Sequence, residues 1–311
     1  MTLGTCQTAV VRSPRIAVAM LVVSGITFGT AGTARALGPD SATSLGVAAV
    51  RIGLGALILL ALLRPLGGRY SELSPLLRRP AVWLAAVFVV LFQTLYFVGV
   101  TLDGVVLGAL LTMGSLPVFS GLLGAFFGHR VHRAWVVSTI ICTVGLVFLS
   151  IDGIEGGSAL GVAAALGSGL AGAVYTVLIK RMLDDGSSEI PLSVAAYLIA
   201  GVIFLPLLLL QSPTWLLTPQ GAAMAVYLGV VAMALPNILW VKALTTLPPG
   251  PTSTLMLTDP AVATILGVVL LGERLAVIGA FGLGLVIVGL VMQGRALARS
   301  ESTVDVPRTG V

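Results

Sequence analysis

Charged side chains are scarce in this chain of 311 residues, in which Asp, Glu, Lys and Arg together make up 9%. An ordinary soluble domain carries about 25% of such residues. Hydrophobic residues make up 57%, and the mean hydropathy is +1.09. This composition argues against an ordinary soluble protein and is typical of a polytopic membrane protein. The net charge of +5 does not indicate nucleic acid binding, because the basic residues are scattered through short gaps between apolar runs.

Cysteine and histidine are also rare, with two of each. Cys6 and Cys142 are far apart and match neither a disulfide framework nor a metal motif. His129 and His132 lie among arginines in one short basic segment, which is typical of a loop. The sequence contains no Walker A pattern and no HExxH motif. We therefore expect no cofactor, no metal site, no catalytic residues and no enzymatic activity.

Long apolar runs are what the sequence has in abundance, and a membrane-spanning helix needs about 20 such residues. The gaps between the runs are short, and the longest is 64–80, so no soluble domain fits between them. The polar segments 1–15 and 294–311 are predicted to be tails. We predict an all-α integral membrane protein with ten transmembrane helices, at 16–37, 42–63, 81–101, 105–127, 134–151, 159–179, 191–211, 221–244, 252–272 and 276–293. The first run ends in TARALG, which also resembles a signal-peptide cleavage site, but its length favours a span.

The distribution of Lys and Arg predicts the orientation, because these residues accumulate in cytoplasmic loops. With the N-terminus inside, 14 of the 17 basic residues fall on the inner side, and Arg35, Arg51 and Arg274 fall outside or within a span. Both termini are therefore predicted to be cytoplasmic, in the cell membrane. The inner set is Arg12, Arg15, Arg64, Arg69, Arg78, Arg79, Arg130, Arg133, Lys180, Arg181, Lys242, Arg295, Arg299 and Arg308.

The chain resembles itself at an offset near 144 residues. Ser24-Gly25 aligns with Ser168-Gly169, and the run LFQTLYFVGVT aligns with LPNILWVKALT. The run GSLPVFSGLLG aligns with LTDPAVATILG, at an offset of 143. The ordered recurrence across three pairs of spans predicts two repeats, 16–151 and 159–293.

Each predicted repeat contains five spans, which is an odd number. The second copy must therefore lie upside down in the membrane relative to the first. Inverted repeats are typical of secondary transporters, which bind substrate near the bilayer midplane at the repeat interface and expose that site alternately to the two sides.

The sequence resembles the EamA type of the drug/metabolite transporter superfamily. The resemblance lies in GSLPVFSGLLGAFFGHRV of the first repeat, and in TDPAVATILGVVLLGERL followed by GAFGLGLVIVGLV of the second. Repeats of that family commonly have a proline in the fourth helix, an LGER-like turn and a glycine-rich fifth helix. The resemblance covers about 16–293 and implies a ten-helix, two-repeat exporter of small metabolites.

This chain departs from the family pattern at His129, where a glutamate is expected. The departure weakens any chemical role for the corresponding Glu273, which together with Arg274 indicates a helix-capping turn. The run LPPGPTSTLMLTDPA is also somewhat similar to threonine/homoserine exporters, which places amino acids first among the candidate substrates.

Two charged residues fall inside predicted spans, where a charge costs about 2.5–3.5 kcal/mol at the bilayer centre. Arg51 lies about 14 Å into its span, and Asp259 lies at a similar depth when entered from the opposite side. One interpretation is a structural salt bridge between two helices. The other is a substrate site, in which Arg51 binds the carboxylate of a zwitterionic amino acid and Asp259 binds its ammonium group.

Pro117 and Pro260 occupy matching positions of the two repeats, and each removes a backbone donor inside a span. The carbonyls of Met113 and Met256 are thereby freed. Bent helices and free carbonyls suit a midplane cavity. The alternative is a packing kink without a ligand.

Gln93 and Asn237 are polar amides at matching depth, each followed three residues later by an aromatic residue, Tyr96 or Trp240. Each aromatic shares a helix face with its amide. These four residues are candidates to line the cavity; alternatively, the amides join helices and the aromatics pack in the core. Tyr175 is a weaker candidate of the same kind.

The sequence thus predicts a secondary transporter of the cell membrane that exports a small metabolite by alternating access. Its expected partners are the lipid bilayer and a small-molecule substrate, with the proton as candidate coupling ion and a homodimer as candidate assembly. A non-transporting sensor or assembly factor and a membrane-embedded lipid enzyme remain as alternatives.

Overall fold

The computed structural model describes residues 13–151, 157–210 and 213–299, and this part of the chain is helical, without a strand. The helices are α1 (Pro14–Ala36), α2 (Ser44–Leu62), α3 (Tyr70–Leu77), α4 (Pro80–Phe126), α5 (Arg133–Ser150), α6 (Ala159–Asp184), α7 (Glu189–Leu210), α8 (Pro219–Gly229), α9 (Leu235–Thr246), α10 (Pro249–Leu255), α11 (Thr258–Leu271) and α12 (Val277–Arg299), with a 3₁₀ turn η2 (Thr214–Leu217) and a π turn η3 (Val230–Ala234).

Nine helical segments of the described chain are long and apolar enough to cross a membrane. One of them, α4, has 47 residues and contains the non-helical residue Gly104 (φ 83°, ψ 160°). A straight helix of that length would measure about 70 Å, more than twice the roughly 30 Å hydrocarbon core. Gly104 divides α4 into the third and fourth spans. The predicted all-α fold with ten spans is confirmed.

The helix boundaries differ from the predicted spans in several places, of which two change the expected layout. The gap 64–80 contains the short helix α3, capped where Arg69 N donates to Glu72 Oε1 at 3.1 Å. Helix α12 continues to Arg299, beyond the predicted span end at 293. Residues 1–12 and 300–311 of the predicted tails, and residue 211 of the seventh predicted span, lie outside the described residues.

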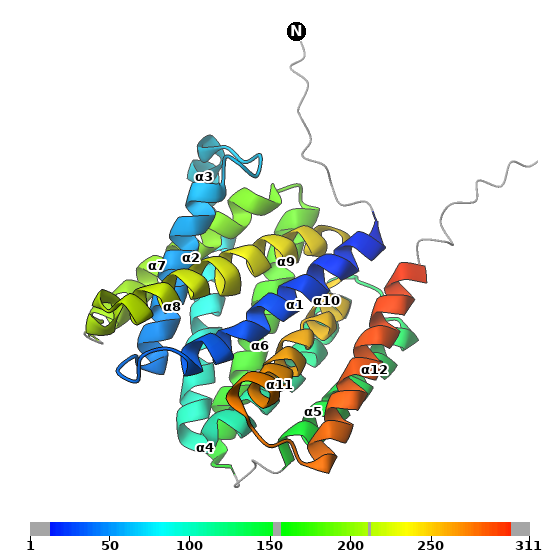
Figure 1. The fold of residues 1–311 in the computed structure, drawn as a ribbon. Coiled ribbons are helices and arrows are strands. Elements are labelled where there is room, and N and C mark those ends of the chain that lie inside the picture. The colour runs from blue at the N-terminus through cyan, green and yellow to red at the C-terminus, as the bar shows by residue number, and fades with distance from the viewer. Residues whose placement is uncertain (1–12, 152–156, 211–212, 300–311) are drawn as a thin grey trace, which may run out of the picture.

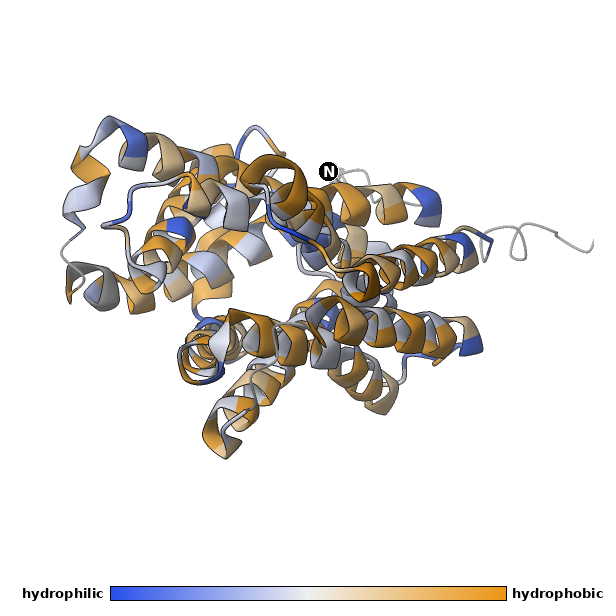
Figure 2. Cartoon of the chain, turned by 60° about the horizontal axis from the view of Figure 1, so that its bottom comes forward, coloured by the Kyte–Doolittle hydropathy of each residue, from blue (hydrophilic) through white to orange (hydrophobic). Residues whose placement is uncertain are grey.

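The outer surface suits a lipid environment. Hydrophobic residues run along the helices, and hydrophilic residues gather toward helix ends and connections (Figure 2). Large apolar side chains such as Val269 and Phe126 are highly exposed. Lipid tails are as apolar as these side chains, so exposing them to the membrane interior carries no penalty. Helix α1 begins and α12 ends on the same side of the bundle (Figure 1).

Hydrogen bonds between helices recur at the offset found in the sequence. Ser24 of α1 donates to the carbonyl of Pro236 in α9 at 2.8 Å. Ser168 of α6 donates to the carbonyl of Phe92 in α4 at 2.7 Å. Each partner of the second bond lies 144 residues from the corresponding partner of the first, with the roles of the two halves exchanged.

Close helix approaches follow the same rule. A Cβ added to Gly25 would lie 2.6 Å from Thr258 Cβ, and a Cβ added to Gly169 would collide with Ser115 Oγ. Helices α5 and α12 pack on each other at Gly145 and Gly289. The close contacts of these two glycines are likewise exchanged between the halves.

The two helix-ending turns at GHR and GER also match. Gly128 and Gly272 adopt positive φ angles of 92° and 70°, which glycine tolerates without strain. The next residue then donates its backbone N–H to a carbonyl of the helix: His129 to Gly124 at 3.0 Å, and Glu273 to Gly267 at 3.1 Å.

Candidate functional site

The ninth predicted span, 252–272, is interrupted close to Asp259. Helix α10 ends at Leu255 and α11 begins at Thr258, with a turn at Met256 and Leu257 between them. Because Pro260 has no N–H for the carbonyl of Met256, that carbonyl instead accepts from Asp259 N at 3.0 Å. Asp259 thus stands in the first turn of α11, where the helix dipole favours a negative charge.

Pro117 behaves differently from Pro260. It is buried inside the second part of α4, and the described backbone dihedrals remain helical there. Pro260 therefore follows a helix break, whereas the matching Pro117 lies inside a continuous helical segment.

Arg51 of α2 lies in the electrostatic neighbourhood of Asp259, Tyr197 and Tyr96. Both Arg51 and Asp259 are half-buried. No hydrogen bond or ion pair within 4.0 Å joins these two described side chains. The Nε atom of Arg51 is buried and has no hydrogen-bond partner.

Aromatic rings extend from this charged pair into the second half, beginning with Tyr197. Tyr175 of α6 stacks face to face on Trp240 of α9, with ring centroids 5.5 Å apart and planes at 10°. Tyr197 of α7 meets Tyr175 edge to face, with centroids 6.3 Å apart. Tyr96 of α4 is half-buried and interacts electrostatically with Asp259. The structure thus brings together Arg51, Asp259, Tyr96 and Tyr197, and Tyr197 adjoins the stacked pair of Tyr175 and Trp240.

The two predicted amides are placed differently from each other. Asn237 is buried, and its Nδ2 donates to the carbonyl of Met233 at 3.0 Å, within its own helical span. The π turn η3 and Pro236 disturb the regular ladder at this point, and the Asn237 side chain repairs it. Gln93 is half-buried on α4, one turn before Tyr96, and lies on the same helix face.

Tyr197 was missed by the sequence reasoning. Its counterpart at the repeat offset is Gly53, so the internal repeat gives no signal for it. A phenol hydroxyl inside an apolar span is the one available clue, because a buried tyrosine needs a polar partner.

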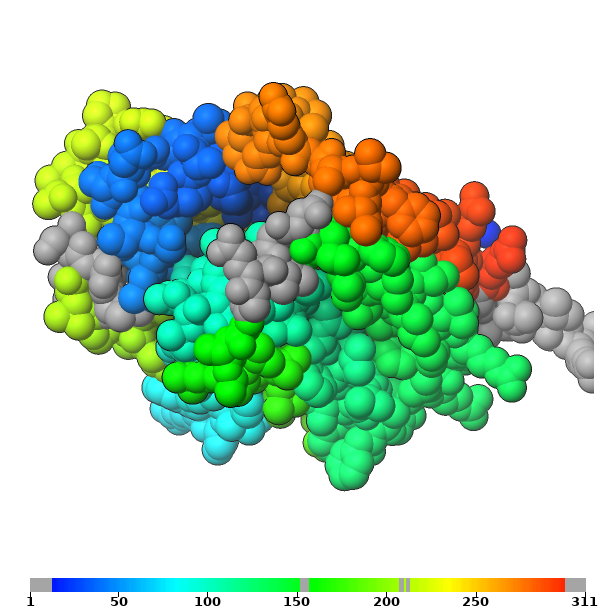
Figure 3. Space-filling view, turned by 90° about the horizontal axis from the view of Figure 1, so that it is seen from below, coloured from blue at the N-terminus to red at the C-terminus, as the bar shows by residue number. Residues whose placement is uncertain are grey.

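The site has a more open and a more closed side. Seen from below, the surface is hollowed between the blue N-terminal helices, the teal part of α4 and the orange α11 (Figure 3). These helices carry Arg51, Tyr96 and Asp259, each of which keeps part of its side chain accessible. A polar, partly accessible centre inside an apolar bundle can bind a polar solute.

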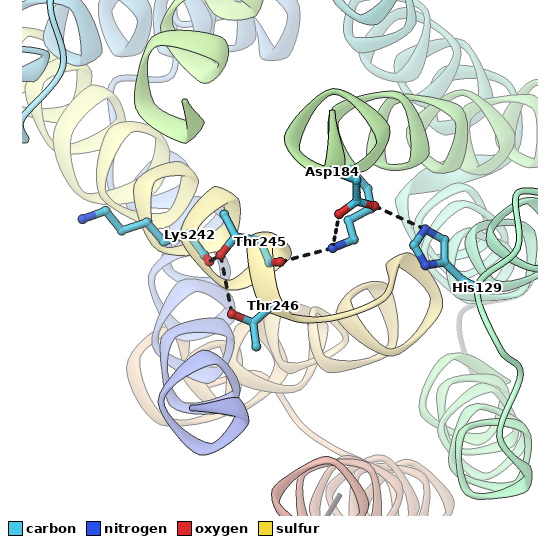
Figure 4. Close-up of polar contacts among 6 residues, drawn as sticks. His129, Asp184, Lys242, Thr245 and Thr246 are labelled. Atoms are coloured by element: carbon cyan, nitrogen blue, oxygen red, sulfur yellow. Dashed lines mark hydrogen bonds and ion pairs between the residues drawn. The ribbon is translucent and has the colours of Figure 1, made fainter. Parts of the chain in front are cut away.

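On the side that carries both ends of the described chain, a polar network joins α6 to α9 within the second half and includes His129 of the first half (Figure 4). Lys180 of α6 bonds Asp184 Oδ1 at 2.9 Å and donates to the carbonyl of Thr245, at the end of α9, at 3.2 Å. His129, in the turn between α4 and α5, lies 3.8 Å from Asp184 Oδ2. Burial and the Lys180 ammonium lower the pKa of His129, and Asp184 offsets only part of this effect. The side chain of Lys242 points away from the network (Figure 4).

Hydroxyl contacts fasten α10 to the helices beside it. Ser253 Oγ donates to Ser120 Oγ of α4 at 2.8 Å. Thr254 Oγ1 accepts from Trp135 Nε1 at 3.1 Å and lies 2.9 Å from Thr139 Oγ1, both on α5. The half-helix before the break is therefore tied to the first half of the chain.

Comparisons with known proteins find similarity over nearly the whole chain. A model of the EamA-like transporter family matches residues 159–294. The "Uncharacterized transporter YwfM" of Bacillus subtilis (strain 168) is 31% identical over 297 residues, covering 92% of this chain and 95% of that protein. The "Threonine/homoserine exporter RhtA" of Escherichia coli (strain K12) is 32% identical over 302 residues, covering 92% and 93%.

A solved crystal structure superposes with a TM-score of 0.76 over 92% of this chain and 98% of that one. Its sequence identity is 18%, so this similarity concerns the fold.

Proposed function

Since the chain belongs to the EamA-like transporter family, we propose that it is a secondary transporter that exports a small amino acid or a similar metabolite by alternating access. Membership establishes a multi-pass membrane transporter. The substrate class, the direction and the mechanism are our proposal, and the relatives named for threonine and homoserine export support the substrate class.

The separation of Arg51 from Asp259 is the observation that carries the proposal. Opposite charges inside a membrane attract strongly, and a purely structural pair would be expected to close. Here they interact electrostatically without an ion pair within 4.0 Å, and the Arg51 Nε has no partner. A zwitterionic amino acid, with its carboxylate toward Arg51 and its ammonium toward Asp259, would give each of these side chains a partner of opposite charge.

Alternating access is supported by the exchanged contacts of the two halves. The bonds Ser24–Pro236 and Ser168–Phe92 are what two inverted copies of one five-helix unit would make. We propose that 16–151 and 159–293 are such copies, which rock about a site at their interface.

The side that carries the chain ends is assigned to the cytoplasm, because 14 of the 17 Lys and Arg residues fall there in the predicted topology. The Lys180 network then closes the cytoplasmic side, and the hollow faces outward. Reporter fusions after Arg295 and within 152–158 should report inside and outside, respectively. The opposite pattern would overturn this orientation.

Proton coupling follows as a hypothesis from the same pair. Burial disfavours a charged carboxylate, and a nearby arginine favours it. When a substrate carboxylate draws Arg51 away, Asp259 loses its counter-charge and takes up a proton more easily. Substrate export would then be linked to proton movement.

Metabolite export and reconstituted flux test the function. Extracellular and intracellular metabolites are compared in cells with and without the chain, and the accumulated compound is then assayed in proteoliposomes. Asp259→Asn keeps the side-chain shape and should abolish or uncouple transport, whereas the exposed Asp40→Asn should not. Normal pH-dependent flux by a well-folded Asp259→Asn protein would show that the carboxylate is structural. If the wild type gives no flux, the sensor or enzyme alternatives are favoured.

A further inference from the structure

Helices α4 and α10 are in close contact between the chain-end side of the bundle and the helix break before Asp259. Near the end of α4, a Cβ added to Gly124 would lie 3.6 Å from the ring of Pro249. One turn deeper, a Cβ added to Gly250 would lie only 2.9 Å from the Cα of Gly121, so the two backbones touch. The two helices therefore close this side without any side chain between them.

Polar side chains fasten this contact further into the bundle. Ser253 Oγ donates to Ser120 Oγ at 2.8 Å, and Trp135 Nε1 donates to Thr254 Oγ1 at 3.1 Å. Thr139 Oγ1 lies 2.9 Å from the same Thr254 Oγ1. All five side chains are buried, and hydrogen bonds are stronger inside a protein than in water. We call these five residues the inner clasp.

The clasp is not repeated in the other half of the sequence. The equivalent positions lie at the repeat offset of 143 for α10 and the second part of α4, and at 144 for α5. None of them carries a hydroxyl or an indole. They are Ala263, Leu110, Leu111, Gly279 and Leu283. If the two halves exchange shapes, the opposite side can close by apolar packing, but these residues cannot form the hydrogen bonds of the clasp.

We propose that the inner clasp is a gate latch, which holds the site closed toward the cytoplasm in the protein without substrate and opens once in each transport cycle. This inference rests on the proposed alternating access and orientation, and it names the residues that set the resting state. Hydrogen bonds that exist on one side only favour the state in which that side is closed. The chain should therefore rest with its site open to the outside.

A reversible cross-link tests whether the clasp opens during transport. Ser120→Cys and Ser253→Cys are combined in a Cys6→Ser chain, while the buried Cys142 stays in place. The two serine oxygens are 2.8 Å apart, so oxidation should join the two cysteines. Counterflow of the twenty radiolabelled L-amino acids, each in turn, is measured in proteoliposomes that contain the full-length chain. Flux should fall in proportion to the cross-linked fraction and return on reduction, whereas oxidation should not change the flux of either single-cysteine variant.

Alkylation tests whether the clasp sets the resting state. Met256→Cys lies in the break between α10 and α11, in the same Cys6→Ser background, and is labelled with an impermeant maleimide from the cytoplasmic side of inside-out vesicles. Trp135→Phe removes the donor and keeps an aromatic ring. It should raise the labelling rate about fivefold, as for the loss of one neutral hydrogen bond, and Ser253→Ala should do the same. Thr264→Ala is the matched control, because Thr264 Oγ1 donates to the carbonyl of Pro260 in its own helix at 2.9 Å.

The outcomes separate the latch from the proposed function. No counterflow of any amino acid by the reduced protein would overturn both. Full flux through the cross-linked protein would overturn the latch alone, and so would labelling rates in Trp135→Phe and Ser253→Ala that equal the rate in Thr264→Ala. If oxidation forms no disulfide, the labelling rates decide.

Discussion

Replacing Lys180 by methionine should open the closed side of the protein, because it frees α9 of the second half from α6, which packs mainly on α4 of the first half. The ammonium group joins α6 to the end of α9, through the 3.2 Å bond to the Thr245 carbonyl. Its side chain is 7% exposed. Methionine keeps the length and the apolar stem and removes only the charge, so the packing between the helices is largely conserved.

The expected size of the effect follows from the hydrogen bond that the substitution removes. A hydrogen bond from a charged donor contributes about 1.5–3 kcal/mol. The pair with Asp184 adds little, because it lies within α6 at i,i+4, Asp184 is 45% exposed, and exposed pairs contribute about 0–1 kcal/mol. A destabilisation of the closed arrangement by about 2 kcal/mol would shift the ratio of closed to open molecules by about 30-fold.

Cysteine labelling measures this shift. Thr176 lies one helical turn deeper than Lys180 on the same face and is 4% exposed. Thr176→Cys is introduced into a Cys6→Ser chain, while the buried Cys142 stays in place. The rate of alkylation from the cytoplasmic side of inside-out vesicles is then recorded with an impermeant maleimide.

The labelling rate should rise by about the same factor, roughly 30-fold, in Lys180→Met. Lys242→Met is the matched control, since Lys242 is a half-buried lysine on α9 that points away from the network. Equal labelling rates in the two variants would refute the role of Lys180 in closure.

Two further predictions concern the same network and the helix packing. Because burial and Lys180 lower the pKa of His129, the closed arrangement favours neutral His129; its contribution is complete above the ordinary value of about 6.5 and is lost as the pH falls through the lowered pKa. Because maleimide reacts with the thiolate, whose fraction falls with pH, each labelling rate of Thr176→Cys is divided by that of the unfolded protein at the same pH. This normalised rate should increase from pH 7.5 to 5.5, and His129→Gln should flatten that dependence; an unchanged slope would contradict the assignment. Gly289→Val should lower the melting temperature of the purified protein, because a Cβ there would lie 2.9 Å from the Ser138 carbonyl oxygen and overpacking costs about 1–3 kcal/mol or more. Gly284→Val on the same helix is the control, since its Cβ would meet nothing within 4 Å; equal melting temperatures would count against tight packing at Gly289.

The ten spans could be predicted because the length and hydropathy of each run are fixed by the bilayer. Arg51 and Asp259 could be identified because a charge inside an apolar run is conspicuous in a sequence. Tyr197 could not, because its partner at the repeat offset is a glycine and an uncharged side chain does not stand out.

Other residues have contacts in the structure that the sequence did not predict. The repeat matched Asn237 with Gln93, but beside the π turn and Pro236 the Asn237 amide donates to the Met233 carbonyl of its own span, and its side chain also bonds Tyr197 of α7. Lys180 was predicted as a basic residue of the inner side, and its bond to Thr245 depends on a contact between α6 and α9 that no local pattern encodes.

The unlike helices at the two matching prolines have a dynamic consequence. In two copies of one unit, the break before Pro260 and the continuous helix around Pro117 are two shapes that the same element can take. If the copies exchange these shapes, α10 and α11 join into one rod, and α4 bends near Met113. The accessible side of the site would then change from one membrane face to the other. Each copy would form the contacts that the other copy makes in this structure. In that proposal the two end states would be close in energy, and unmatched residues such as His129 and Glu273 would bias which one predominates.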